Sequence, residues 1–514
     1  MTLPIRSLLL WLGAPLLIGA AGLVLGQDAN WDFRNYHYYN GYAFLNGRLG
    51  FDLLPANHPT YYNPLLDAPV YWAMQVMPAS LVALLLGTFQ GLIAPLLYRI
   101  ALIVAPPAPR RHLLAAILTA AGCTGAMTMS EIGATFHDNT LSVLVLGGLL
   151  LNLLAITSPL MRRDFFLAVG GGAFLIGAAC GFKLTMSLYA VGLVVALAVA
   201  LPWRRWLVVA VVAGASGLAG FLATGGYWSW VLWSHFGNPL FPHFNNIFHS
   251  SFAADTAYRD LKFIEKLGSL ERIFLPLFST VNSWLVAEAD FFDPRILAAF
   301  VLCIPALSFL RRAAVGGRAL IAFAVASYIV WVWLYCIYRY VLPLEMLAPI
   351  LCLAALMALR LHRALQIAAA IGVLLAVATS YPKNLEPVRV AFGQHFVTVE
   401  GLPPISDDTL LVMAGDRPAA FILPFLPPRV RAVRINDWPF LGQNSQEGFE
   451  PLIRRTIANH MGPMLMLTHS EDFARARTIA TLFGLRVLDN CTPLGTNLTQ
   501  DKFLLCQLQV VTLQ

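Results

Sequence analysis

Apolar segments near 20 residues long recur along the chain, and they constrain its fold more than any other feature. About 20 such residues are what an α-helix needs to cross the hydrocarbon core of a bilayer, which is roughly 30 Å thick. The composition agrees, because 58% of the residues are hydrophobic and only 12% are charged. A soluble domain carries about 25% charged residues. The sequence therefore predicts an all-α polytopic membrane protein.

About eleven segments have the length and apolarity of transmembrane helices. The first is interpreted as an uncleaved span, because it is long for the apolar core of a signal peptide. The predicted spans are 8–26, 80–104, 113–129, 140–157, 165–181, 185–201, 206–225, 296–310, 319–335, 341–358 and 364–380.

Short arginine clusters separate alternate pairs of these spans. The positive-inside rule makes their side cytoplasmic, together with the N-terminus. This topology also accounts for the net charge of +7, so no nucleic-acid partner is expected. The clusters are Arg6, Arg110 with Arg111, Arg162 with Arg163, Arg204 with Arg205, Arg311 with Arg312 and Arg318, and Arg360 with Arg363. The extracytoplasmic side then receives the loops 27–79, 130–139 and 226–295 and everything beyond residue 381. Within these loops, short helices lying along the membrane surface are expected at 34–48 and 255–274.

The composition changes after the last predicted span. Residues 381–404 contain several prolines and are interpreted as a linker. From about residue 405, short apolar strands alternate with helical stretches, which predicts a small α/β domain over 405–514. Strands are expected at 410–415, 431–436, 464–469 and 502–511, and helices at 446–461 and 471–483. The region has no Gly-rich phosphate loop, so we interpret it as an extracytoplasmic accessory domain. Cys491 and Cys506 lie in this region, and the sequence does not decide between a disulfide and two free thiols.

The first external loop, 27–79, is polar and aromatic although it lies between two apolar spans. Asp32 follows the first span directly, in WDFRNYHYYN. A carboxylate there can act as a general base or orient an acceptor hydroxyl. Alternatively, it caps the following helix. Further residues of this loop offer hydrogen bonds and aromatic faces to a sugar, or simply suit a membrane interface; they are His58, Tyr61, Tyr62 and Asn63.

The short loop 130–139 contains Glu131, His137 and Asp138. These groups can hold a divalent metal or assist the base, and the candidate metal ligands are Asp32, Glu131 and Asp138. Alternatively, Asp138 caps the following span and interacts with its dipole. The sequence requires no cofactor, and the need for a metal stays open.

Two basic residues lie at the ends of predicted spans on the side that is poor in arginine clusters. Lys183, in CGFKLTMS, can reach the interface or hold a phosphate as a point charge. Arg339, in IYRYVLPLE, breaks the positive-inside pattern, which favours phosphate binding. Glu345 in the next span is a candidate ion-pair partner for Arg339.

Together these motifs resemble the GT-C glycosyltransferases, in particular the branch of the protein O-mannosyltransferases and the lipid A aminoarabinose transferase. That family has an acidic residue after the first span, a tyrosine four residues on, and then an alanine–leucine–glycine pattern. The matching residues are Asp32, Tyr36, Ala43, Leu45 and Gly47. Phe33 stands where the family often has glutamate.

The likeness continues through later motifs and covers about residues 8–360. NPLLDAPVYW resembles the end of the family's first loop, with Asn63 in place of a lysine. Asp138 matches an acidic residue before the fourth span. GFKLT around Lys183 and RYVLP from Arg339 to Pro343 resemble two further family elements.

The resemblance implies a GT-C-like catalytic domain over residues 1–380, in an integral multi-pass protein of a bacterial inner membrane. It implies inverting transfer of a hexose or pentose from a polyprenyl-phosphate donor to an extracytoplasmic glycan, lipid or protein. Asp32 and Asp138 are then the catalytic residues, with Asp32 as the base. The implied substrate-binding residues are Tyr36, His58, Tyr61, Asn63, Glu131, His137, Lys183, Arg339 and Tyr340.

Two other functions fit the same membrane topology. A flippase or transporter of lipid-linked sugars would have polar residues midway along its spans, whereas here they gather in the loops and at the span ends. A polysaccharide polymerase or ligase would share the external loops and Arg339, but the element around Asp32 argues against it.

Overall fold

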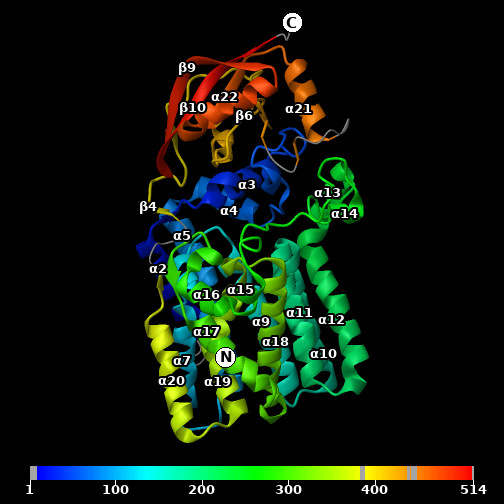
Figure 1. The fold of residues 1–514 in the computed structure, drawn as a ribbon, viewed down its shortest axis with the longest axis vertical. Coiled ribbons are helices and arrows are strands. Elements are labelled where there is room, and N and C mark those ends of the chain that lie inside the picture. Colours follow the sequence, from blue (N-terminus) through cyan, green and yellow to red (C-terminus); the bar gives the residue numbers. More distant parts are fainter. Residues whose placement is uncertain (1–8, 383–387, 437–439, 442–447, 512–514) are drawn as a thin grey trace. The chain divides into compact units, whose positions relative to one another are not determined.

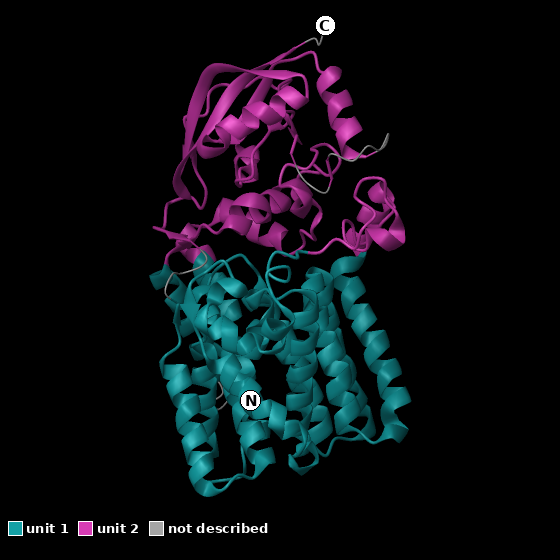
Figure 2. Ribbon diagram, viewed as in Figure 1, with its two compact units in different colours: residues 1–25, 83–226, 260–387 teal, residues 26–82, 227–259, 388–514 magenta. Residues whose placement is uncertain are grey.

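The computed structural model of the chain describes residues 9–382, 388–436, 440–441 and 448–511. The chain divides into two compact units, each built from three segments, as Figure 2 shows. Unit 1 comprises residues 1–25, 83–226 and 260–387, and unit 2 comprises residues 26–82, 227–259 and 388–514. Arg6, residues 383–387 of the predicted linker and the start of the predicted helix 446–461 lie outside the described residues.

Six described helical stretches are long and apolar enough to cross a membrane. They are Ala79–Val104, Asp138–Thr157, Arg162–Phe182, Trp203–Phe236, Val315–Leu334 and Tyr338–Leu359. Five shorter apolar helices, Leu9–Leu25, Arg111–Cys123, Leu184–Ala200, Arg295–Leu307 and Arg363–Ala378, fall on the other five predicted ranges. The helical class is therefore confirmed, and the number of eleven spans stays a prediction.

Most of the predicted cytoplasmic arginine clusters lie at or just before the N-terminal end of a helix in unit 1. These helices are α7 (Arg111–Cys123), α10 (Arg162–Phe182), α12 (Trp206–Phe221), α18 (Val315–Leu334) and α20 (Arg363–Ala378). The helix dipole disfavours a cation at that end by about 0.3–1 kcal/mol. Helix stability therefore does not explain these arginines, and the topological interpretation is the better one.

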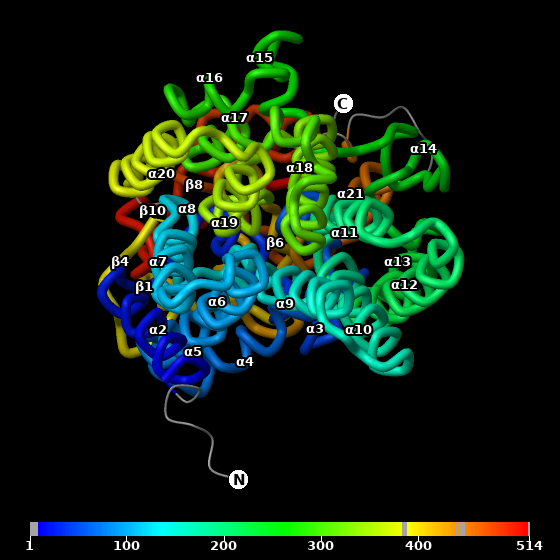
Figure 3. Tube along the Cα trace, turned by 90° about the horizontal axis from the view of Figure 1, so that it is seen from below, coloured from blue at the N-terminus to red at the C-terminus, as the bar shows by residue number. Residues whose placement is uncertain are grey.

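Close helix packing in unit 1 depends on small residues. Helix α10 packs against α9 (Asp138–Thr157) and α12, and Figure 3 shows these helices end on. A Cβ at Gly177 of α10 would overlap the backbone of Gly217 in α12. A Cβ at Gly148 of α9 would lie 2.6 Å from the carbonyl oxygen of Gly172. Glycines that let backbones approach closely are typical of helix pairs in membranes.

Unit 2 contains a mixed six-stranded sheet with the order β5-β9-β10-β8-β6-β7 (Figure 1). The strands are β5 (Val399–Glu400), β6 (Leu410–Met413), β7 (Arg431–Arg434), β8 (Met464–His469), β9 (Leu485–Thr496) and β10 (Thr499–Val510). β6 pairs in parallel with β7 and β8, whereas β10 pairs antiparallel with β8 and β9. The helices of this region are α21 (Phe449–Ala458) and α22 (Phe473–Leu482). β6, β7, β8 and β10 fall on the predicted strand ranges, while the role of residues 405–514 as an accessory domain stays a prediction.

Strand β9 is the longer of two strands in this sheet that the sequence analysis missed; the other is β5, which lies in the predicted linker. Its sequence, LRVLDNCTPLGT, contains proline, glycine, aspartate and asparagine, all of which are depleted in strands. It forms because it pairs along much of its length with β10, in a register that sets Cys491 opposite Cys506. The two cysteines form a disulfide, which answers the question that the sequence left open.

The first polar loop also belongs to unit 2 and covers the edge of this sheet. Leu53 forms a parallel bridge with Val433 of β7. Its amide donates to Ala432 O at 2.9 Å, and its carbonyl accepts from Arg434 N at 2.9 Å. The loop thereby satisfies backbone groups that an edge strand would leave unpaired.

The first polar loop also contains short helices. They are η2 (Phe33–His37), α3 (Tyr38–Leu45) and α4 (Asp67–Val76), so the expected helix over 34–48 is confirmed in position. The helix expected over 255–274 is wrong for most of its length, because only α15 (Ser269–Ile273) forms there. Gly268 occupies the N-cap of α15, and short helices without a packing partner are marginal.

Candidate active site

A buried carboxylate meets two cations at helix ends in unit 1. Asp138 is the first residue of α9, and its side chain is 0% exposed. Lys183 Nζ, just beyond α10, donates to Asp138 Oδ1 at 2.6 Å. Arg339, in the 3-10 turn η9 (Tyr338–Val341), places Nη1 3.8 Å from Asp138 Oδ2. The fold thus brings together three predicted site residues that are far apart in the sequence.

Aromatic rings and carbonyls hold the two cations of this cluster. The guanidinium of Arg339 lies 4.0 Å from the ring centroid of Phe136, and Lys183 Nζ lies 5.1 Å from that of Tyr340. Cations are attracted to such ring faces. Lys183 Nζ also donates to Phe136 O at 3.4 Å. An ammonium and a guanidinium are the side chains that bind phosphate in proteins, so the cluster contains groups suited to an anionic ligand.

The geometry of Asp138 argues against a simple capping role. His137, not Asp138, occupies the N-cap of α9, in a left-handed conformation with φ = 65°. This conformation is uncommon outside glycine and turns the chain sharply into the helix. Asp138 then lies in the first turn, where the dipole favours a negative charge, and its carboxylate pairs with Lys183.

Asp32 lies in unit 2, and its capping alternative is wrong. It has helical backbone angles (φ −64°, ψ −38°), and its side chain caps no backbone amide of η2. Asn30 does so instead, because Phe33 N donates to Asn30 Oδ1 at 2.6 Å. Asp28 in turn accepts from the side-chain amide of Asn30 at 2.9 Å. Capping therefore does not explain Asp32, and its catalytic role stays a proposal.

The remaining predicted residues of the first loop have different environments. Tyr61 is buried in an aromatic core, stacked on Phe449 with ring centroids 5.4 Å apart, and packing is sufficient reason for its presence. His58 is more accessible, and its Nε2 lies 2.7 Å from the hydroxyl of Tyr258. The buried His37 lies 2.7 Å from the carboxylate of Asp67. The binding roles of His58, Asn63 and Tyr36 stay predictions.

His243 and Tyr258 are neighbours of His58 that are not among the predicted site residues. His243 Nδ1 lies 3.1 Å from Tyr258 O, and its ring stacks on Tyr62 with centroids 5.9 Å apart. Burial lowers the pKa of His243, which keeps this ring neutral at neutral pH. These residues meet the first loop only through the fold, so the sequence alone does not pair them with His58.

A second buried ionic network in unit 1 was also missed. Asp293 Oδ1 accepts from Arg295 Nε at 2.7 Å at the start of α17 (Arg295–Leu307), and both side chains are buried. Glu345, which is fully buried in α19 (Leu342–Leu359), accepts from Thr128 N at 3.1 Å instead of pairing with Arg339 as expected. The sequence did offer a signal for this network. Asp293 and Arg295 lie at the start of the predicted span 296–310, and ionisable residues in or beside a span are costly unless they are paired.

The metal prediction finds little support in the Asp138 cluster. Asp138 Oδ1 already pairs with the Lys183 ammonium. A carboxylate that is neutralised in this way is a weak ligand for a hard cation. A metal site formed by Asp32, Glu131 and Asp138 stays a prediction.

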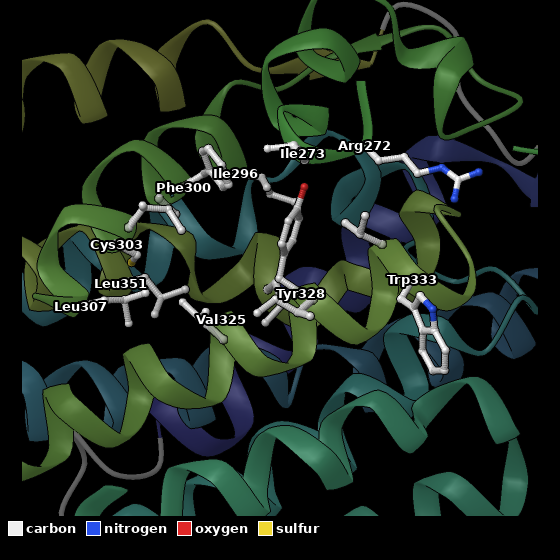
Figure 4. Close-up of a pocket in the computed structure, with 16 residues that line it drawn as sticks. Arg272, Ile273, Ile296, Phe300, Cys303, Leu307, Val325, Tyr328, Trp333 and Leu351 are labelled. Carbon is white, nitrogen blue, oxygen red and sulfur yellow. The ribbon is translucent and has the colours of Figure 1, made fainter. Parts of the chain in front are cut away.

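An apolar pocket of about 450 Å³ lies among helices of unit 1. Its walls come from α17, α18 and α19, with Arg272 and Ile273 of α15 at its edge. Figure 4 shows the guanidinium of Arg272 extending away from the apolar side chains. Trp333 at the end of α18 and Leu344 at the start of α19 both line it, and the turn that joins these helices carries Arg339.

No family model matches the sequence, and no curated protein matches it either. Among solved structures, the chain is similar to ArnT from Cupriavidus metallidurans bound to undecaprenyl phosphate, with a TM-score of 0.53 and 13% identity over 98% of each chain. The apo form of that protein aligns over the same share of each chain with a TM-score of 0.42. At this identity the comparison establishes the fold alone. The resemblance indicated by the motifs is therefore confirmed at that level: the chain has the fold of ArnT, a lipid A aminoarabinose transferase of the GT-C class.

Proposed function

We propose that this protein is a membrane glycosyltransferase that moves a sugar from a polyprenyl-phosphate donor to an extracytoplasmic acceptor. The observation that carries the proposal is the cluster of Asp138, Lys183 and Arg339, in which a buried carboxylate holds two cations at helix ends. It is supported by the fold, which is shared with an ArnT structure that holds undecaprenyl phosphate.

The chemistry assigns a separate task to each charged group. As the bond between the anomeric carbon and the phosphate oxygen breaks, negative charge grows on the departing prenyl phosphate. Lys183 and Arg339 stabilise that charge, and they are held in place before the reaction, which is how preorganised groups lower a barrier. Asp138 orients the two cations. Asp32 takes the proton of the acceptor hydroxyl as its oxygen attacks the opposite face of the sugar, which inverts the anomeric carbon.

The prenyl chain of the donor lies in the apolar pocket beside α18 and α19 in this proposal. The pocket volume of about 450 Å³ falls within the range of small-molecule sites, roughly 300–1,000 Å³. Its lining is almost entirely hydrocarbon, and the same helix connection bears Arg339. Each buried methylene of the chain contributes about 0.8 kcal/mol of binding free energy.

The first expected result concerns the donor. Purified protein should transfer sugar from a polyprenyl-phosphate sugar to an acceptor in a cell-envelope extract, release polyprenyl phosphate, and leave nucleotide sugars untouched. The donor KM should fall as the prenyl chain is lengthened at constant detergent, until the pocket is filled. Radiolabelled sugar and chromatography of the released lipid measure both effects.

Two outcomes would contradict this proposal. If no polyprenyl-phosphate sugar is consumed with any acceptor fraction, the protein is not such a transferase. If the intact sugar lipid instead crosses the membrane of proteoliposomes, the flippase alternative is correct.

The second expected result concerns Arg339. Arg339→Ala should raise the donor KM on the order of tenfold to a hundredfold, because a hydrogen bond to a charged group contributes about 1.5–3 kcal/mol. Arg339→Lys keeps the charge but loses the fork geometry, so its effect should be smaller. Arg339 is preferred to Lys183 for this test because removing Lys183 leaves the buried Asp138 without its 2.6 Å partner. Unchanged donor KM in Arg339→Ala would exclude the phosphate role.

A further inference from the structure

Residues 126–139 form the segment that carries Glu131, His137 and Asp138, and buried polar side chains hold it from two sides. It contains only the five-residue helix α8 (Ala126–Ser130), followed by turns that lead to α9. Its backbone makes short-range hydrogen bonds of its own, such as Glu131 N to Met127 O at 3.1 Å and Ala134 N to Glu131 O at 3.0 Å. Side chains of neighbouring helices make further hydrogen bonds to its backbone.

Gln90, the last residue of α5 (Ala79–Gln90), holds the middle of this segment. Its side chain is 1% exposed. Gln90 Oε1 accepts from Gly133 N at 2.7 Å, and Nε2 donates to Ala134 O at 3.2 Å. One amide therefore satisfies a donor and an acceptor on two successive residues. Gly133 has φ = 71°, so this turn needs glycine and has a defined shape.

Glu345 holds the beginning of the segment from α19. Its Oε1 accepts from Thr128 N at 3.1 Å, and Thr128 O accepts from Asn139 Nδ2 at 3.0 Å. Asn139 is the residue next to Asp138. A Cβ at Gly125 would overlap the Glu345 carboxylate, so the backbone can approach this carboxylate only because residue 125 is glycine. Two hydrogen bonds therefore connect Glu345 with the start of α9.

Asp293 and Arg295 extend the same support to the preceding turn. Asp293 Oδ2 accepts from Ala126 N at 2.9 Å. Arg295 donates to Ala121 O at 2.5 Å and to Thr124 O at 2.8 Å. The turn between α7 and α8 is thus held at its backbone donors and its backbone acceptors by one buried ion pair.

These buried charges are a poor means of gaining stability. Apolar residues of similar volume often replace a buried ion pair with no loss of folding stability, because the cost of desolvating the two charges offsets their attraction. What directed hydrogen bonds add is one defined backbone conformation. Here that conformation is the one in which Asp138 meets Lys183 and Arg339.

We propose that Gln90 and Glu345 are positioning residues, which fix the segment 126–139 so that the Asp138 carboxylate sets the two phosphate-binding cations. This inference rests on the proposed function for its catalytic consequence. Neither side chain touches the substrate in this scheme, and both act through the backbone of the segment.

The experiment compares Gln90→Leu with Asn152→Leu. Asn152 is a matched control, because it is a buried amide of unit 1 whose Nδ2 donates to Gly148 O within α9 itself. Gln90→Leu should lower kcat on the order of tenfold to a hundredfold, since a misplacement of 1 Å can cost that much. The donor KM should change much less. Amide hydrogen exchange should become faster at residues 131–137 in this variant only.

A double-mutant cycle tests whether Gln90 acts through Asp138. If it does, Gln90→Leu should cause little further loss of kcat in an Asp138→Asn background, because residues of one network are not additive. Additive losses would overturn the positioning role. If Gln90→Leu fails to fold, Gln90→Glu retains the acceptor for Gly133 N and allows the same comparison.

Glu345 adds a test by conservative replacement. Glu345→Gln keeps an oxygen that accepts from Thr128 N, so this variant should retain most of the wild-type kcat. Glu345→Leu has no such oxygen, so its kcat should fall. Unchanged exchange at residues 131–137 in both leucine variants would overturn the inference. Absence of transfer by the wild-type protein would contradict the proposed function instead, and the exchange measurements would still decide on positioning.

Discussion

Asp32→Asn should lower kcat for sugar transfer by about two to four orders of magnitude, the usual contribution of a general base. Asparagine has nearly the same shape as aspartate but accepts no proton from the acceptor hydroxyl. The helix that follows keeps its cap in this variant, because Asn30, not Asp32, accepts from Phe33 N. The measurement is kcat at saturating donor, with the folded fraction checked by size-exclusion chromatography.

A matched control is Asp255→Asn. Asp255 belongs to the same unit and pairs with His249, and both side chains are about two-thirds exposed. Its replacement should leave kcat near the wild-type value. If Asp32→Asn is also near wild type, Asp32 is not the base, and another carboxylate must take the proton.

Asp52→Ala should destabilise unit 2 by about 3–5 kcal/mol, which is typical when one partner of a buried ion pair is removed. Asp52 is 2% exposed and accepts from Arg48 Nε at 2.6 Å and from the Tyr39 hydroxyl at 2.8 Å. It also accepts from Ala432 N at 2.8 Å, beside the edge strand β7. The variant leaves the Arg48 guanidinium buried without its carboxylate and frees the edge of the sheet.

Thermal unfolding of the purified variant measures this effect. The control is Asp489→Ala, which removes an exposed pair with Arg477 in the same unit. Exposed pairs contribute only about 0.2–1 kcal/mol, so the control should unfold close to the wild-type temperature. Equal unfolding temperatures for the two variants would show that the Arg48–Asp52 pair does not hold the first loop on the sheet.

The helices were predictable because a bilayer imposes a local condition on the sequence. A segment of about 20 residues must be apolar and must satisfy its own backbone in a helix, whatever its neighbours are. The strands at 410–415 and 464–469 were predictable for a related reason, since short apolar runs between turn residues indicate buried strands. Strand β9 was missed because its local preference is poor and its partner β10 decides its conformation.

The candidate site was predictable where charge itself was the signal. Asp138, Lys183 and Arg339 stand out in an apolar chain, and the structure brings them together. Tyr61 has the same polar and aromatic character as its neighbours, yet it lies in the core of unit 2. Gln90 gave no signal at all, because a glutamine at the end of an apolar helix looks like any residue that reaches the interface.

The sequence by itself determined that this chain is a helical membrane protein with a C-terminal sheet, and which charged residues were candidates for its chemistry. Hydrophobicity and charge are properties of each residue, so they can be assigned without knowing which other residues it contacts. Only the tertiary structure decided that Asn30 caps the first loop's helix, that Lys183 pairs with Asp138, and that Gln90 and Glu345 hold the segment between them. Those outcomes depend on which side chain reaches which backbone group, and such contacts join residues that lie far apart in the sequence.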